Sequence, residues 1–96
     1  MEEILYLNNL YDYYGSLLTV KQQLYFQKYY FENLTMQEIA DQYQISKNAV
    51  SKQIDLIKER LFYYESNLKL YYKKQQINKL LGQFDQNIID KINDLL

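Results

Sequence analysis

The 96-residue sequence has no cysteine, histidine, proline or tryptophan, and it has only two glycines. Without cysteine the chain can form neither a disulfide framework nor a thiolate metal site. Without histidine it lacks the most common metal ligand and general base. Carboxylates at helical spacing, such as Glu38 with Asp41 or Asp90 with Asp94, are interpreted as caps and solvated faces. We therefore expect no metal ion, no cofactor and no enzymatic activity.

Long apolar runs are also missing, since no stretch approaches the roughly 20 residues that cross a bilayer. The N-terminus, MEEILYLNNL, is acidic where a secretory signal is basic. We expect a cytoplasmic protein without membrane insertion. The scarcity of proline and glycine permits long helices almost everywhere and makes turns scarce.

The most informative segment is residues 35–54, TMQEIADQYQISKNAVSKQI, which has the pattern of a helix-turn-helix. Thr35 and Glu38 form a capping box at the start of the first helix. Gln44-Ile45-Ser46 is the predicted turn, with Ser46 as N-cap of the next helix. A left-handed conformation at Gln44, where many such turns have glycine, costs about 1 kcal/mol.

The second helix of this motif has an apolar stripe and a separate polar face. Its stripe contains Val50, Ile54, Ile57 and Leu61 at helical spacing. On the polar face, two lysines are expected to meet phosphate or guanine edges, an asparagine to read adenine or phosphate, and a serine to support the backbone contact. Two residues at the start of the preceding helix are expected to contact phosphate. The candidate nucleic-acid-binding residues are Thr35, Gln37, Lys47, Asn48, Ser51 and Lys52.

The charge distribution agrees with this assignment better than the net charge of −1 does. Residues 1–46 carry two basic and six acidic groups. Residues 47–79 carry eight basic and three acidic groups, and residues 80–96 carry one basic and three acidic groups. The single basic block thus begins at the proposed recognition helix, as a phosphate-binding surface requires. The alternative is that these lysines only solvate long helices.

Two helices are predicted before the motif. The first spans residues 2–14, with Gly15 as its C-terminal stop. The second opens at a capping box of Thr19 and Gln22 and runs from Val20 to about Phe31. The predicted apolar side of the first helix contains Ile4, Leu5, Leu7, Leu10, Tyr11 and Tyr14.

After Leu61 the helical pattern continues to about Tyr72, and residues 73–76 are either a break or an exposed helical turn. Gly82 ends the following segment, and Asp85 could cap a last helix. We expect a head of residues 1–66 and a C-terminal extension of residues 67–96 that forms a homodimer, with intramolecular packing as the alternative. The proposed dimerisation residues are Ile77, Leu80, Leu81, Ile88, Ile92 and Leu95.

Residues 6–72 resemble the YlxM family of small bacterial proteins. The TVKQ, YYFENLTMQEIA and ISKNAV stretches and the segment IKERLFYYESNLKLY carry this similarity. The resemblance implies an all-α protein whose head is similar to region 4 of sigma-70 factors, and a regulatory role. Because the genes of family members lie beside those for the signal recognition particle, it also implies a link with that pathway. Lys52 departs from the acidic residue expected in relatives.

Three functions are consistent with these features. The first is a DNA-binding regulator that uses the helix-turn-helix. The second is an accessory protein that binds signal recognition particle protein or RNA through the same basic block. The third is a protein–protein interaction module that retains the helix-turn-helix as a scaffold, because fold alone does not fix function.

Overall fold

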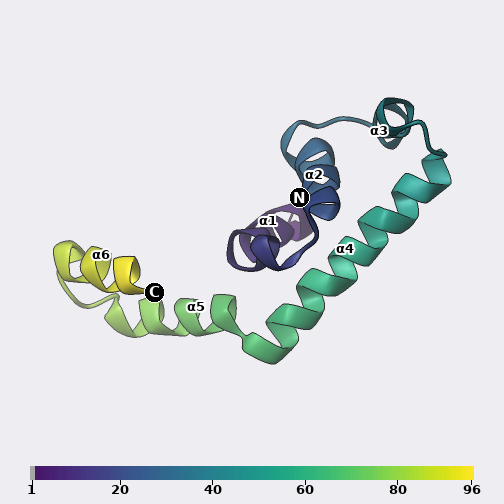
Figure 1. The fold of residues 1–96 in the computed structure, drawn as a ribbon. Helices are drawn as coiled ribbons and strands as arrows, with labels where there is room; N and C mark the ends of the chain where they lie inside the picture. Colours follow the sequence, from purple (N-terminus) through teal and green to yellow (C-terminus); the bar gives the residue numbers. More distant parts are fainter. Residues whose placement is uncertain (1) are drawn as a thin grey trace.

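The computed structural model describes residues 2–96, and within this range all regular structure is helical (Figure 1). The expected all-α fold is thereby confirmed. The molecule measures 52 × 25 × 23 Å, and its radius of gyration of 16.4 Å exceeds the roughly 13 Å of a compact domain of about 100 residues. The helices are α1 (Glu2–Tyr14), α2 (Val20–Phe26), α3 (Met36–Tyr43), α4 (Lys47–Leu68), α5 (Leu70–Leu81) and α6 (Gln86–Leu95), with a 3₁₀ turn at Gly15–Leu17 and a π-helical turn at Gln27–Phe31.

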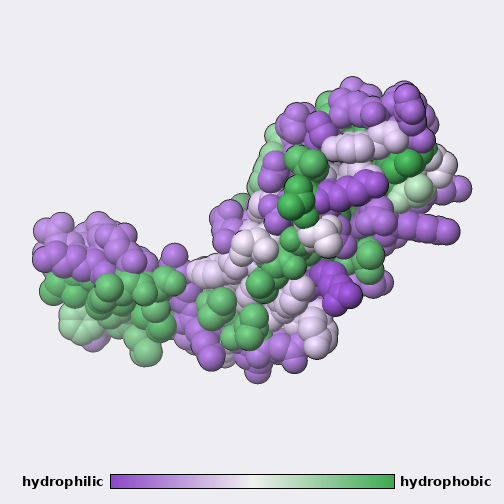
Figure 2. Space-filling model, in the orientation of Figure 1, coloured by the Kyte–Doolittle hydropathy of each residue, from purple (hydrophilic) through white to green (hydrophobic). Residues whose placement is uncertain are grey.

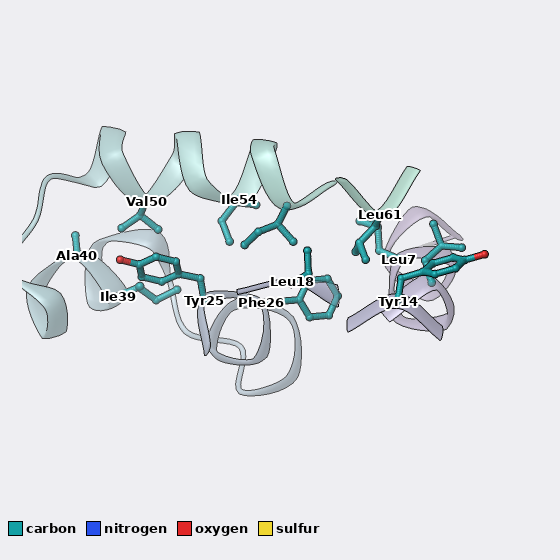
Figure 3. Close-up of a cluster of buried hydrophobic side chains, with 12 residues drawn as sticks. Leu7, Tyr14, Leu18, Tyr25, Phe26, Ile39, Ala40, Val50, Ile54 and Leu61 are labelled. Atoms are coloured by element: carbon teal, nitrogen blue, oxygen red, sulfur yellow. The ribbon is translucent and has the colours of Figure 1, made fainter. Parts of the chain in front are cut away.

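The core forms where α1, α2 and α3 pack against one side of α4 (Figure 3). Side chains at spacings of four, three and four residues make the predicted apolar stripe of α4, and all four are buried. Aromatic side chains from α1 and α2 fill the space between the helices. The buried apolar residues are Leu7, Leu10, Tyr14, Leu18, Tyr25, Phe26, Ile39, Ala40, Val50, Ile54, Ile57 and Leu61.

The predicted helix caps are present. In both capping boxes a threonine Oγ1 accepts from the backbone N–H three residues later, over 3.1 Å at Thr19 and at Thr35. The Gln22 and Glu38 side chains accept from the N–H of the capping residue in return. At the last helix, Asp85 Oδ1 accepts from the Asn87 N–H over 2.7 Å. These contacts are local, which is why the sequence predicts them well.

The predicted bounds of α1 are confirmed, but one expectation about its apolar side is wrong. Ile4 and Leu5 are 47% and 64% exposed, so the apolar side of this helix is narrower than its sequence suggests. α1 ends at Tyr14, so Gly15 follows the last helical residue as predicted, although the chain continues into the 3₁₀ turn without a left-handed conformation. Glycine is required there for space, since a Cβ atom would lie 2.9 Å from Cε2 of Tyr11.

The break in the long helix also lies elsewhere than expected. α4 ends at Leu68, Lys69 adopts a left-handed conformation with φ 56°, and α5 starts at Leu70. Residues 73–76, for which the sequence allowed a break or an exposed helical turn, lie inside α5 and are mostly exposed, so the second alternative is confirmed. The buried carboxylate of Glu65 compensates for the interruption, because it accepts from the N–H groups of Tyr71 and Tyr72 over 3.2 and 3.0 Å. Such a contact depends on the bend itself, so helical periodicity does not reveal it.

The chain after Lys69 forms an arm that leaves α4 at an angle (Figure 1). The first turn of α5 contacts α1, where Tyr71 packs edge-on against Tyr6 with a centroid distance of 5.6 Å. The division of the chain into a head of residues 1–66 and a C-terminal extension of residues 67–96 stays a prediction. Dimerisation through this extension also stays a prediction. Among residues 2–96, no helix combines the length and apolar character needed to cross a membrane.

Candidate nucleic-acid interface

The turn between α3 and α4 has the predicted geometry. Gln44 is left-handed, with φ 55° and ψ 44°, and Ile45 donates its N–H to the carbonyl of Ala40 over 3.0 Å. Ser46 caps α4, since its Oγ accepts from the Ala49 N–H over 3.0 Å. The Ala40 side chain is fully buried between the helices. The small methyl group therefore allows the close crossing on which the motif depends.

The first two turns of α4 present several of the candidate residues to solvent. Lys47, Asn48 and Lys52 are exposed, and Ser51 is half-buried. The first turn of α4 contains Lys47 but no acidic residue. A cation at a helix N-terminus is unfavourable by about 0.3–1 kcal/mol, because it meets the positive end of the helix dipole. This arrangement is therefore stabilised by any anion that binds there.

A groove of about 460 Å³ brings Thr35, Gln37 and Lys47 together. It lies between the start of α3, the start of α4 and the π-helical turn. Asn48, Ser51 and Lys52 do not line it, so the candidate residues divide into a groove group and a group farther along α4. The remaining lining residues are Ile4, Tyr29, Tyr30, Asn33, Leu34 and Met36.

Burial and charge act together at the wall of this groove. Burial raises the pKa of the Tyr30 hydroxyl, although the nearby ammonium group of Lys58 opposes this shift. Burial alone would lower the pKa of Lys58, but Tyr30 and Glu3 outweigh it and raise the pKa above its ordinary value. The Lys58 Nζ lies 3.6 Å from Oε1 of Glu3. Lys58 is thus held in its charged form and is already paired.

The sequence did not indicate how the groove would be built. Its aromatic wall comes from the π-helical turn, which ends near Asn33, a residue with φ 57°. Gln37 is also less free than expected, because its Nε2 donates to Oδ1 of Asp41 over 2.9 Å. A phosphate contact at Gln37 therefore competes with this bond. The positive charge of the interface comes from α4, since α3 itself carries two carboxylates and no lysine.

Comparison with known proteins identifies the family of this chain. Residues 1–95 match the family model UPF0122, described as "Putative helix-turn-helix protein, YlxM / p13 like". The chain belongs to the UPF0122 family. The resemblance inferred from the sequence is confirmed over nearly the whole chain.

Several UPF0122 proteins are similar along almost their full length. The relative from Geobacillus sp. is 35% identical over 94 residues, which covers 98% of this chain and 86% of the relative. The relative from Ureaplasma parvum serovar 3 is 38% identical over 91 residues, which covers 94% of this chain and 92% of the relative. The relative from Mycoplasma capricolum is 38% identical over 91 residues, which covers 95% of this chain and 80% of the relative. In this UPF0122 protein, α3, the turn at Gln44 and α4 form the helix-turn-helix.

Proposed function

We propose that this protein is a DNA-binding regulatory protein that contacts duplex DNA through α3 and the first turns of α4. The cationic start of α4 carries the proposal. Lys47 stands at an electrostatically unfavourable position, and Lys52 is exposed just beyond it. A DNA phosphate would relieve the repulsion, because it supplies the anion that the helix N-terminus lacks.

The other candidate residues have supporting roles in this proposal. Asn48 would contact adenine or phosphate, and Ser51 would bind the backbone. Thr35 and Gln37 would contact phosphate at the start of α3, beside Lys47 in the groove. Similarity of the head to region 4 of sigma-70 factors is part of the same proposal, because helix-turn-helix modules place their second helix in the major groove.

A charge reversal on α4 tests this function. We expect Lys47→Glu with Lys52→Glu to abolish binding to duplex DNA while the helical circular dichroism stays unchanged. Lys21→Glu with Lys91→Glu is the matched control, because it reverses two exposed lysines on α2 and α6. Unchanged DNA binding by the α4 variant, or equal loss in the control, contradicts the proposed interface.

A second candidate is an accessory protein of the signal recognition particle pathway that binds RNA. The absence of arginine from the recognition face favours this candidate. Arg60 is the only arginine in the chain, and it lies outside that face. Lysines bind phosphate as point charges and do not provide the bidentate guanine contact of arginine. RNA binding that the α4 variant loses, with no DNA binding by the wild type, supports this candidate.

We also propose a homodimer formed by α5 and α6. Hydrophobic side chains gather over this end of the molecule (Figure 2). Leu80, Ile88 and Leu95 are 74%, 47% and 86% exposed, whereas Ile77, Leu81 and Ile92 are half-buried. A second copy would cover these side chains, and each fully buried one contributes about 1.5–3 kcal/mol. Two recognition helices in one dimer would bind paired half-sites.

A further inference from the structure

We propose that the exposed face of α5 is a second nucleic-acid-binding surface, which binds phosphodiester groups independently of α3 and α4. Lys69, Lys73, Gln76 and Lys79 form this face, which we name the α5 lysine stripe. Lys73, Gln76 and Lys79 follow each other at spacings of three residues along one side of α5, which Leu80 shares, and Lys69 is the left-handed residue that precedes the helix. All four side chains are exposed.

The stripe has no carboxylate to neutralise it. The chain has four lysines and no acidic residue between Glu65 and Asp85. The Glu65 carboxylate is buried and accepts hydrogen bonds from Tyr14 and from two backbone N–H groups of α5, so it does not pair with the stripe. Among residues 2–96, Lys58 and Glu3 make the one ion pair, and it lies elsewhere.

The lysines also occupy positions that oppose helix stability. Lys69 and Lys73 stand four residues apart, where like charges repel each other. Lys73 lies near the N-terminus of α5, where the helix dipole disfavours cations, whereas Lys69 also ends α4, whose dipole favours a cation at that end. Lys74 adds a further charge, although its Nζ lies 6.0 Å from the centre of the Tyr13 ring, away from the stripe. A bound anion would remove these unfavourable interactions.

The chemistry of the stripe fits the phosphate groups of a nucleic-acid backbone. Tyr72 on the same side is 56% exposed, and its hydroxyl can donate a hydrogen bond to a phosphate oxygen. Lysines suit phosphate contacts, and such contacts carry no sequence information.

The stripe is too far from the recognition residues to belong to the same contact. The 22 residues of α4 separate them, which corresponds to about 33 Å along the helix. α5 then leaves α4 at an angle (Figure 1). The stripe would therefore bind a separate backbone segment, in duplex DNA or in base-paired RNA, which present the same phosphodiester chemistry.

A salt titration of four proteins tests this inference. They are the wild type, Lys73→Glu with Lys79→Glu, the α4 variant Lys47→Glu with Lys52→Glu, and the control Lys21→Glu with Lys91→Glu. The probes are a DNA duplex of about 30 base pairs, roughly three turns, and an RNA hairpin of similar length. For the α5 variant on DNA, the slope of log affinity against log salt should fall by about 1.8, because two phosphate contacts are lost. We expect its thermal stability to be no lower than that of the wild type.

The result also separates this inference from the function proposed for α4. If the α5 variant binds both probes as the wild type does, or if the control loses as much affinity, the stripe is not a binding surface. If the α5 variant loses affinity while the α4 variant does not, the stripe is supported and the α4 interface is not. Wild-type binding to phosphatidylserine vesicles and to neither nucleic acid overturns the inference in favour of a membrane.

Discussion

Tyr14 on α1 donates a hydrogen bond from its hydroxyl to Oε1 of Glu65 on α4 over 2.5 Å, although 51 residues separate the two in the chain. Both side chains are buried. The same hydroxyl accepts from the N–H of Leu70 over 3.0 Å, and the Glu65 carboxylate accepts from the next two N–H groups of α5. The pair thus joins α1, α4 and α5, and it sets the direction in which the C-terminal arm leaves the head.

Removing the Tyr14 hydroxyl should destabilise the protein. Tyr14→Phe keeps the aromatic ring in the core but leaves one lone pair of the buried Glu65 carboxylate and the Leu70 N–H without their partner. We expect a loss of about 1–3 kcal/mol in the free energy of unfolding, measured by urea denaturation. Tyr63→Phe, at a 60% exposed position, is the control and should change little. Equal stability of the two variants contradicts the role of the pair.

Tyr14 should also make the stability of the protein depend on pH in the alkaline range. Burial, followed by the hydrogen bond to Glu65, raises the pKa of Tyr14 from 10.0 to about 12. Because the folded pKa lies above the unfolded one, the stabilisation is complete below about pH 10 and is lost as pH rises towards 12. Thermal melts across this range should show a smaller loss for Tyr14→Phe than for the wild type. Parallel curves for the two proteins contradict this assignment.

Local and long-range interactions differ in how far the sequence predicts them. The caps at Thr19, Thr35 and Ser46 are readable because donor and acceptor lie within three residues of each other. The break at Lys69 is not readable, because the carboxylate that compensates for it is fixed by a tyrosine 51 residues away. Uninterrupted apolar periodicity therefore predicted a longer helix.

In the candidate site, too, the sequence predicts the local features and does not predict those that depend on irregular structure. The exposed lysines of α4 follow from helical spacing once Ser46 is identified as the cap, and the left-handed turn at Gln44 is confirmed. The aromatic wall of the groove depends on the π-helical turn at Gln27–Phe31. Its i→i+5 hydrogen bonds shift the side chains away from the positions that a regular α-helix would give them. Tyr29 and Tyr30 could therefore not be placed there from their spacing alone.

The close crossing of α3 and α4 should not tolerate a larger side chain. Ala40 is fully buried, so Ala40→Leu should overpack the helix pair and cost about 1–3 kcal/mol in a thermal or urea melt. Gln42→Leu introduces the same side chain at an exposed position of the same helix and is the matched control. An Ala40→Leu protein as stable as the wild type means that the crossing is looser than this packing implies.

The proposed dimer makes a prediction about molecular mass in solution. Ile88 and Ile92 stand four apart on the apolar side of α6, so Ile88→Asp with Ile92→Asp should give monomers whose head remains folded. Analytical ultracentrifugation together with circular dichroism measures both properties. Asn87→Asp with Lys91→Asp adds acidic groups at exposed positions of the same helix and should leave the dimer intact. A wild type that is already monomeric at tens of micromolar contradicts the dimer.

The most direct test of nucleic-acid binding by α3 and α4 is a titration of ¹⁵N-labelled protein with duplex DNA, followed by amide chemical shifts. The proposed interface predicts that the largest shifts fall in residues 35–37 and 46–52, which contain the candidate contacts. The buried positions Leu7 and Leu10 of α1 should move least. Shifts confined to α5 and α6, with residues 35–37 and 46–52 unchanged at saturation, would contradict DNA recognition by the helix-turn-helix.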